Sequence, residues 1–245
     1  MDLGLKGKKV VVQGASSGMG YAIAKAFVEE GCRVGICSSN EERIRKAAKE
    51  IKAAASFAID LDKDKAGALL IEQAISELGG VDILVTNTGS PKHGFASELT
   101  SVDWDQGYNR LWRSAVEAIS ASIPHMKKNQ FGRFLLLTSI AAKEPISGLT
   151  LSNSYRAGLL GFMKSISHEL AKDGITANAV LPGLTKTKRL DDLGSKEEQL
   201  LNQIPMRRFG KPEEIASLVV FLASRSADYI TGQAIACDGG YLHSY

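Results

Sequence analysis

The segment KKVVVQGASSGMGYAIAKAFVEEG, residues 8–31, decides the fold. It begins with a β-branched run at residues 10–12, typical of a buried strand, and passes directly into a turn that contains Gly14, Gly18 and Gly20. Apolar residues then recur at helical spacing as far as Gly31, a residue type that commonly ends a helix. A glycine turn before a helix presents backbone N–H groups and the positive end of the helix dipole. The segment therefore predicts a site for the pyrophosphate of a dinucleotide.

The spacing of these glycines leaves two interpretations open. It is G-x-x-x-G-x-G, whereas the commonest dinucleotide fingerprint is G-x-G-x-x-G. The first interpretation is a dinucleotide site, and the second is a tight turn that binds no ligand. The remainder of the chain favours the first.

Composition narrows the class of protein. The 245 residues suffice for one α/β domain over residues 1–245, and no linker divides them. The net charge of +3 is scattered along the chain, so we expect neither a nucleic acid nor a membrane surface as partner. The three cysteines lack CxxC spacing, which argues against a disulfide framework or a metal site. Without an apolar run of about 18 residues or a signal peptide, the chain is expected to be cytoplasmic.

Strands and helices are predicted to alternate along the chain. Further strands are expected at residues 33–37, 56–59, 81–85, 134–138, 176–180 and 234–237, and helices at 41–55, 65–78, 103–128 (interrupted at Pro124), 152–172 and 213–223. This order predicts a Rossmann-type, doubly wound parallel sheet with helices on both faces. Ligands of such sheets bind beyond the carboxyl ends of the strands, where the strand order reverses. Residues 184–210, polar over most of their length, are expected to form a substrate flap.

Further motifs follow the strands in a recognisable order. After the glycine turn come Asp60-Leu61, Asn87 with Gly89, Pro182-Gly183 with Thr187, and the C-terminal groups Arg208-Phe209-Gly210, Thr231-Gly232 and Asp238-Gly239-Gly240. From residue 5 to residue 242 this order resembles the short-chain dehydrogenase/reductase family, and within it the 3-oxoacyl-[acyl-carrier-protein] reductase-like branch. The resemblance implies an NAD(P)-dependent oxidoreductase that reduces a carbonyl or oxidises a secondary alcohol. It implies cofactor contacts from Gly14, Ser16, Ser17, Gly18, Met19, Gly20, Ser38, Ser39, Asp60, Leu61, Asn87, Gly89, Arg156, Pro182, Gly183, Thr185 and Thr187.

The catalytic residues that the family normally uses are a serine, a tyrosine, a lysine four residues after it, and an asparagine. Ser139 falls at the place of the serine. Ser152 stands where the tyrosine is expected, and Arg156 where the lysine is expected. Leu111 occupies the asparagine position. The chain is therefore similar to members of this branch that match the catalytic pattern imperfectly.

Several side chains are candidates for the missing functions, each with an alternative. Arg156 carries a permanent positive charge that suits a cofactor ribose or a developing oxyanion. Ser152 either donates a hydrogen bond in catalysis or caps the N-terminus of its helix. Tyr155, nearly one turn beyond Ser152, either replaces the missing tyrosine or packs in the interior. His93 titrates near neutral pH and either supplies a proton or is simply solvated.

The end of the second strand bears on the choice of cofactor. An acidic residue there would bind the adenosine ribose of NAD and repel a 2′-phosphate. The sequence instead reads Ser38-Ser39-Asn40, with Arg43 one turn further. The absence of an acidic residue favours NADP, although no basic residue sits at the usual clamp positions, and NAD is the alternative.

Three hypotheses for function follow. The first is an NADP-preferring oxidoreductase acting on a small-molecule or acyl-carrier-linked carbonyl substrate. The second is a catalytically silent dinucleotide-binding protein that serves as a regulatory or partner subunit. The third is an assembly role without cofactor, against which the glycine turn argues. The family resemblance also implies a homotetramer or homodimer, with helices 103–128 and 152–172 at one interface.

Overall fold

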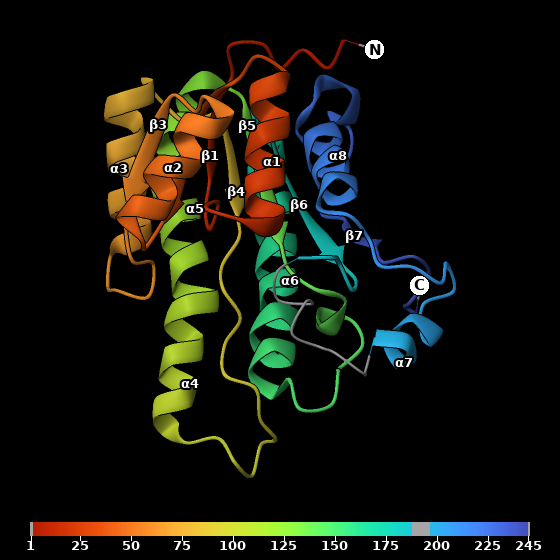
Figure 1. Cartoon of the computed structure of the whole chain (residues 1–245). Helices are drawn as coiled ribbons and strands as arrows, with labels where there is room; N and C mark the ends of the chain where they lie inside the picture. The colour runs from red at the N-terminus through yellow and green to blue at the C-terminus, as the bar shows by residue number, and fades with distance from the viewer. Residues whose placement is uncertain (1, 188–196, 245) are drawn as a thin grey trace.

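The computed structural model describes residues 2–187 and 197–244. Its strands form one parallel sheet of seven in the order β3-β2-β1-β4-β5-β6-β7. They are β1 (Lys9–Val12), β2 (Arg33–Ser38), β3 (Ala55–Ala58), β4 (Ile83–Thr86), β5 (Gly132–Leu137), β6 (Ile175–Pro182) and β7 (Ala234–Cys237). The α-helices are α1 (Gly18–Glu29), α2 (Glu41–Ile51), α3 (Ala66–Leu78), α4 (Ser101–Gly107), α5 (Ser114–Asn129), α6 (Thr150–Leu170), α7 (Glu197–Asn202) and α8 (Pro212–Ala223). Figure 1 shows them along the chain.

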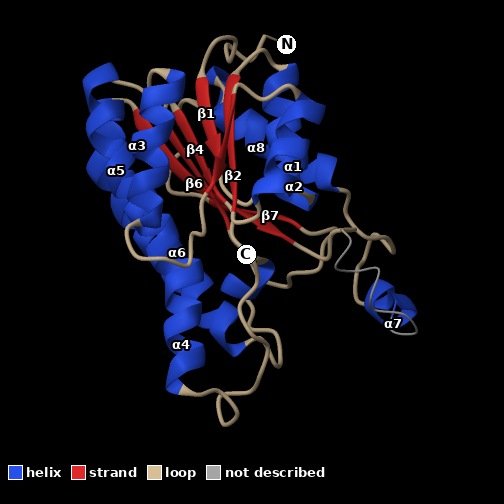
Figure 2. Ribbon diagram, turned by 60° about the vertical axis from the view of Figure 1, so that its left-hand side comes forward, coloured by secondary structure: helices blue, strands red, loops and turns tan. Residues whose placement is uncertain are grey.

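Helices cover both faces of the sheet. Alternate residues of a strand point to opposite faces, so Val10 and Val12 join one hydrophobic cluster with α1, α2 and α8. Val11 joins a second cluster with α3, α5 and α6. Figure 2 shows the two helical layers on either side of the strands. The predicted doubly wound parallel sheet is therefore confirmed.

The region expected as one helix over residues 103–128 differs from that prediction. It begins at Ser101 behind a capping box in which Thr100 and Asp103 bond reciprocally. It then passes through a π-helical segment, Tyr108–Arg113, before α5. The expected interruption at Pro124 is wrong, because α5 runs through it to Asn129. The irregularity lies instead at the π-helical segment, where the Ser114 hydroxyl donates to the Arg110 carbonyl over 2.6 Å.

Part of the expected flap, residues 188–196, lies outside the described residues. Among those described, Thr185 pairs with Gly210 in an isolated parallel bridge, which joins the start of the flap to its end. No helix in the described ranges has both the length and the apolar character needed to cross a bilayer.

A close approach of α3 to α5 gives a test of this packing. A Cβ atom on Gly67 would lie 2.7 Å from the Ser114 carbonyl oxygen and 2.8 Å from the Ala118 nitrogen. We expect Gly67→Ala to lower the free energy of unfolding by about 2 kcal/mol, because the helices must move apart. Thermal or denaturant unfolding measures the change.

Gly161→Ala is the matched control. Gly161 lies within α6, and a Cβ atom added there would meet nothing within 4 Å. At this position the change should stabilise the protein by up to about 1 kcal/mol through helix propensity alone. Equal stabilisation by both substitutions would contradict the close α3–α5 contact.

Candidate functional site

The glycine turn after β1 is held by a side chain from the end of β4. The Asn87 amide Nδ2 donates to the Gly14 carbonyl over 2.9 Å. A Cβ atom on Gly14, whose φ is +58°, would lie 2.5 Å from the Asn87 carbonyl oxygen. A Cβ atom on Gly20 would lie 2.3 Å from the Gly14 carbonyl oxygen. Only glycine allows this close approach of turn, helix and neighbouring strand.

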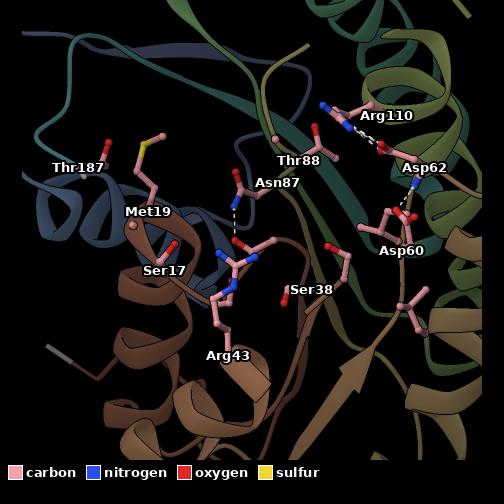
Figure 3. Close-up of a pocket in the computed structure, with 17 residues that line it drawn as sticks. Ser17, Met19, Ser38, Arg43, Asp60, Asp62, Asn87, Thr88, Arg110 and Thr187 are labelled. Atoms are coloured by element: carbon pink, nitrogen blue, oxygen red, sulfur yellow. Dashed lines mark hydrogen bonds and ion pairs between the residues drawn. The ribbon is translucent and has the colours of Figure 1, made fainter. Parts of the chain in front are cut away.

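A cavity of about 620 Å³ opens at this turn. Its volume falls in the range of small-molecule and cofactor sites. Figure 3 shows side chains from the turn, from β2 and α2, and from the segments after β3 and β4 around it. It is lined by Gly14, Ser16, Ser17, Gly18, Met19, Ser38, Ser39, Arg43, Ile59, Asp60, Leu61, Asp62, Asn87, Thr88, Gly89, Arg110 and Thr187.

Most of the predicted cofactor contacts therefore share one cavity. Gly20 lies beneath it as a packing residue of α1. Pro182, Gly183 and Thr185 belong to the segment after β6, in which the Thr185 hydroxyl donates to the Gly183 carbonyl over 3.1 Å. This segment leads to Thr187, which does line the cavity. The predicted contacts of these residues and of Arg156 with a cofactor stay predictions.

Five residues that line the cavity are not among the site residues predicted from the sequence. The sequence indicates Arg43 only as a nearby base. The structure shows why it reaches the wall: the Asn40 side chain caps α2 by accepting from the Arg43 backbone N–H over 2.8 Å. This cap fixes the first turn of α2 beside Ser38 and Ser39. The other four residues are Ile59, Asp62, Thr88 and Arg110, of which Arg110 has no local sequence signal because its partners are distant along the chain.

Ser139 lies two residues beyond the end of β5. Its Oγ accepts a hydrogen bond from the Ala141 backbone N–H over 3.1 Å, at the start of the short 3₁₀ turn Ile140–Ala142. A hydroxyl that accepts in this way still has its own hydrogen to donate. Ser139 is thus held by a structured turn and retains a donor for a ligand.

Arg156 is buried in α6. Its Nε donates to the Ser152 Oγ over 3.1 Å. One guanidinium nitrogen donates to the carbonyl oxygens of Leu137 and Thr138 over 3.3 and 2.9 Å. These are the two residues directly before Ser139. The structure therefore links Arg156 both to Ser152 and to the backbone that carries Ser139.

The interpretation of Ser152 as a helix cap is wrong. The helix begins at Thr150 behind Leu149, so Ser152 lies inside its first turn and is buried. Its hydroxyl is engaged by Arg156 one turn further along the same helix. The sequence pattern Ser-Asn-Ser suggested a cap because the local hydrogen bonds of serine are more often formed at helix ends.

Tyr155 is half-buried and packs against aromatic residues of α4 and the π-helical segment. Its hydroxyl donates to the Trp104 carbonyl over 2.9 Å, and its ring meets those of Trp104 and Tyr108 edge-on. Burial, followed by the negative charge of Asp105, raises the pKa of the Tyr155 hydroxyl. A raised pKa makes this hydroxyl a poorer acid near neutral pH.

The remaining candidates are an exposed histidine and a buried leucine that cannot donate a hydrogen bond. His93 is exposed in the segment after β4. Leu111, at the position of the expected asparagine, is buried in the π-helical segment. Across the described ranges, no group of three or more histidine, cysteine or acidic side chains is arranged to hold a metal ion.

The parallel sheet and the cavity at the reversal of its strand order form a site of the type that binds dinucleotides. Comparison with known proteins agrees. A family model described as enoyl-(acyl carrier protein) reductase matches residues 14–242. The chain is 36% identical over 242 residues to a Staphylococcus aureus 3-oxoacyl-[acyl-carrier-protein] reductase, FabG, covering 95% of this chain and 97% of the relative.

Solved structures are similar over the whole chain. The L-sorbose reductase of Gluconobacter frateurii, complexed with NADPH and L-sorbose, superposes with a TM-score of 0.94 at 30% identity, covering 100% of both chains. YwfH, an NADPH-dependent reductase of bacilysin biosynthesis, superposes with a TM-score of 0.93 at 30% identity, covering 98% of this chain and 100% of that one.

The chain belongs to the short-chain dehydrogenase/reductase family. The family assignment and the expectation of an NAD(P)-dependent oxidoreductase are confirmed. The relatives named above are reductases, and none of them supports the alternative of a silent protein.

The contacts of Arg156 predict the effect of removing it. Arg156→Ala leaves two buried carbonyls and a buried hydroxyl without this donor, so we expect a loss of about 2–4 kcal/mol in unfolding free energy. We also expect weaker dinucleotide binding, measured by fluorescence titration of the folded variant. Unchanged affinity would remove Arg156 from the cofactor site and leave it a structural residue.

Proposed function

We propose that this protein is an NADPH-dependent reductase of a carbonyl group on a small-molecule or acyl-carrier-linked substrate. The observation that carries the proposal is the cavity wall formed by Ser38, Ser39 and Arg43. In NAD-specific sites of this fold an acidic residue binds the adenosine ribose, whereas a basic residue suits a 2′-phosphate. The two serine hydroxyls and the Arg43 guanidinium at this wall match a site for the 2′-phosphate of NADPH. The NADPH held by the sorbose reductase supports it.

The glycine turn fits the rest of such a cofactor. The N-terminus of α1 begins at Gly18, on the cavity wall, and the first N–H groups of a helix have no partner within it. A pyrophosphate placed there accepts from these groups. Asp60 and Leu61 stand at the wall where the family resemblance places adenine, and Thr187 stands on the side of the nicotinamide loop.

Ser139, Ser152 and Arg156 provide the groups that a carbonyl reduction requires. NADPH, when bound, supplies a hydride to the carbonyl carbon. The Ser139 hydroxyl donates to the carbonyl oxygen, and the fixed charge of Arg156 stabilises the negative charge that develops there. The Ser152 hydroxyl, oriented by Arg156, passes a proton to that oxygen and recovers one from water. Tyr155 has no part in this scheme because its hydroxyl is engaged by Trp104.

The substrate, oligomeric state and compartment are finer parts of the proposal. The FabG relative favours 3-oxoacyl thioesters as the first substrates to test, with residues 184–210 as the flap that selects among them. We propose a homotetramer or homodimer that uses α5 and α6. The free cysteines Cys32, Cys37 and Cys237 agree with a reducing, cytoplasmic compartment.

Cofactor titration and turnover together test the proposal. NADPH and NADH are titrated separately into the wild-type protein, and NADPH oxidation is then followed with a 3-oxoacyl thioester and with a ketose. Tight NADPH binding with steady oxidation supports the reductase. Binding without turnover on any carbonyl would favour the silent alternative, and absence of binding would refute the dinucleotide site.

Arg43 should determine the preference for NADPH. We expect Arg43→Ala to raise the Kd for NADPH about tenfold, because one charge-assisted contact to the 2′-phosphate is lost. The Kd for NADH should stay unchanged, because NADH lacks this phosphate. The matched control is Arg45→Ala on the same helix, since Arg45 is exposed and pairs with Glu41 away from the cavity wall. A similar loss for both cofactors, or from the control, would contradict this assignment.

Ser139 and Tyr155 should differ in their effect on turnover. We expect Ser139→Ala to lower kcat by about 100-fold or more while NADPH still binds, since it removes the donor to the developing charge. Tyr155→Phe should keep kcat within about threefold and leave the pH profile unchanged, because a hydroxyl whose pKa is raised does not ionise in the working range. If Tyr155→Phe lost turnover but kept a normal melting temperature, the result would contradict the packing role and indicate that Tyr155 is catalytic.

A further inference from the structure

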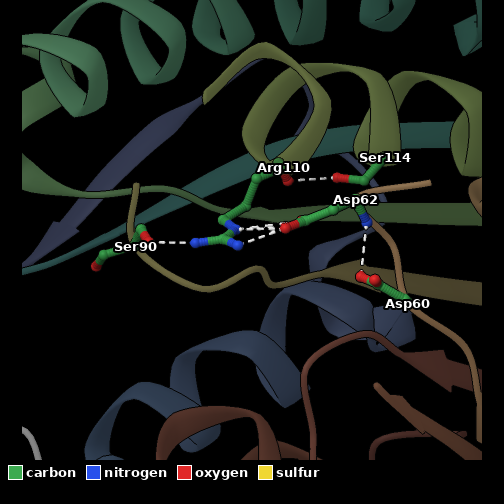
Figure 4. A network of polar contacts seen from close by, with 5 residues as sticks. All are labelled: Asp60, Asp62, Ser90, Arg110 and Ser114. Carbon is green, nitrogen blue, oxygen red and sulfur yellow. Dashed lines mark hydrogen bonds and ion pairs between the residues drawn. The ribbon is translucent and has the colours of Figure 1, made fainter. Parts of the chain in front are cut away.

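One ion pair joins two walls of the cofactor cavity. The Arg110 Nε lies 3.1 and 3.0 Å from the two carboxylate oxygens of Asp62, and a second guanidinium nitrogen bonds to the same carboxylate. The third nitrogen donates to the Ser90 carbonyl over 3.1 Å. Figure 4 shows the Arg110 side chain reaching from its helix between the segments that follow β3 and β4. The guanidinium thus ties together two segments that lie on either side of it.

Arg110 and Asp62 are both part of the cavity surface. Each lines the cavity, and their side chains are 39% and 33% exposed. The segment after β3 is further fixed from within, because the Asp62 backbone N–H donates to the Asp60 carboxylate over 3.1 Å. This hydrogen bond couples the position of Asp62 to that of the Asp60 carboxylate, which lines the same wall.

A second contact on the same helical face provides a comparison. Three residues beyond Arg110, Arg113 pairs with Asp64 over 3.1 Å, and Asp64 lies two residues beyond Asp62. One turn further, the Glu117 carboxylate accepts from the backbone N–H groups of Lys65 and Gly67, each over 3.1 Å. The segment from Asp62 to Gly67 is therefore anchored along the helix at several points. Of the two arginines, only Arg110 lines the cavity.

We propose that Arg110 is a positioning residue for the dinucleotide. It acts through Asp62 and the Ser90 carbonyl, and it holds the segment after β3, which forms the adenosine side of the cavity, against the segment after β4. The bidentate geometry suits this role, because a planar guanidinium constrains both position and orientation of its partner. The charge of Arg110 also compensates that of Asp62. Without it, the wall would present uncompensated carboxylates to a cofactor that carries several negative charges.

The proposal rests on the proposed function only in that the ligand is a dinucleotide. Its test is therefore the affinity for NADPH, read from nicotinamide fluorescence, and turnover is a second readout. We expect Arg110→Ala to raise the Kd for NADPH about tenfold, with kcat at saturating NADPH within about twofold of wild type. Arg110→Lys, which keeps the charge but loses the fork, should recover part of the affinity.

Arg113→Ala is the matched control. It removes an arginine from the same helix and an ion pair to the same segment, but no contact with the cavity, so NADPH affinity should stay within about twofold of wild type. Asp62→Asn, nearly isosteric, should weaken NADPH binding by a smaller factor than Arg110→Ala, because it breaks the ion pair without exposing a carboxylate. This variant also tests the proposal should Arg110→Ala fail to fold.

The outcomes separate this inference from the proposed function. NADPH affinity unchanged in Arg110→Ala, or equally weakened in Arg113→Ala, would overturn the positioning role. Wild-type binding without turnover would refute the reductase and leave the positioning role standing, since that role is read from affinity. Failure of the wild type to bind either cofactor would overturn both.

Discussion

The hydrogen bond from Asn87 to the Gly14 carbonyl is the constraint on which the site depends. β1 lies between β2 and β4, and the chain crosses to opposite faces of the sheet on either side of it. The segments that leave β1 and β4 would diverge there, and the Asn87 amide holds them in contact. Because Gly14 and Gly20 lack side chains, α1 can start directly on this contact. The helix N-terminus and the ends of four neighbouring strands thus surround one cavity, and a larger residue at either glycine would separate them.

Local patterns in the sequence predicted the fold because each element carries its own signal. The β-branched run at residues 10–12 and the glycine turn were each predicted correctly from a few neighbouring residues. Two local interpretations were wrong. Pro124 is accommodated inside α5, and Ser152 lies within α6 and bonds to Arg156 instead of capping the helix. Neither outcome follows from the residue's local preference: Pro124 is tolerated at an exposed position inside α5, and the partner of Ser152 lies four residues along the same helix.

The walls of the cavity were harder to predict because they form between distant segments. Asp62 and Arg110 are 48 residues apart, and no spacing rule relates them. The π-helical segment contributes as well, since it alters the rotation of Arg110 relative to the helix that a regular 3.6-residue period would predict. Motif comparison identified the residues nearest the glycine turn and missed the side chains that close the opposite wall.

The replacements at positions 152 and 156 are best understood as a pair. A serine is small enough to leave room for the arginine beside it, and its hydroxyl accepts from the Arg156 Nε. The guanidinium then reaches the carbonyls of Leu137 and Thr138, which offsets the cost of burying its charge. A permanent positive charge is thus buried beside the backbone that carries Ser139. In the reaction proposed above, Arg156 would supply the electrostatic part of carbonyl reduction, and the proton would come from a serine hydroxyl, which is a weaker acid than the family's tyrosine. Under that proposal, charge stabilisation and proton supply come from two different side chains, and this is the main chemical difference from the family pattern.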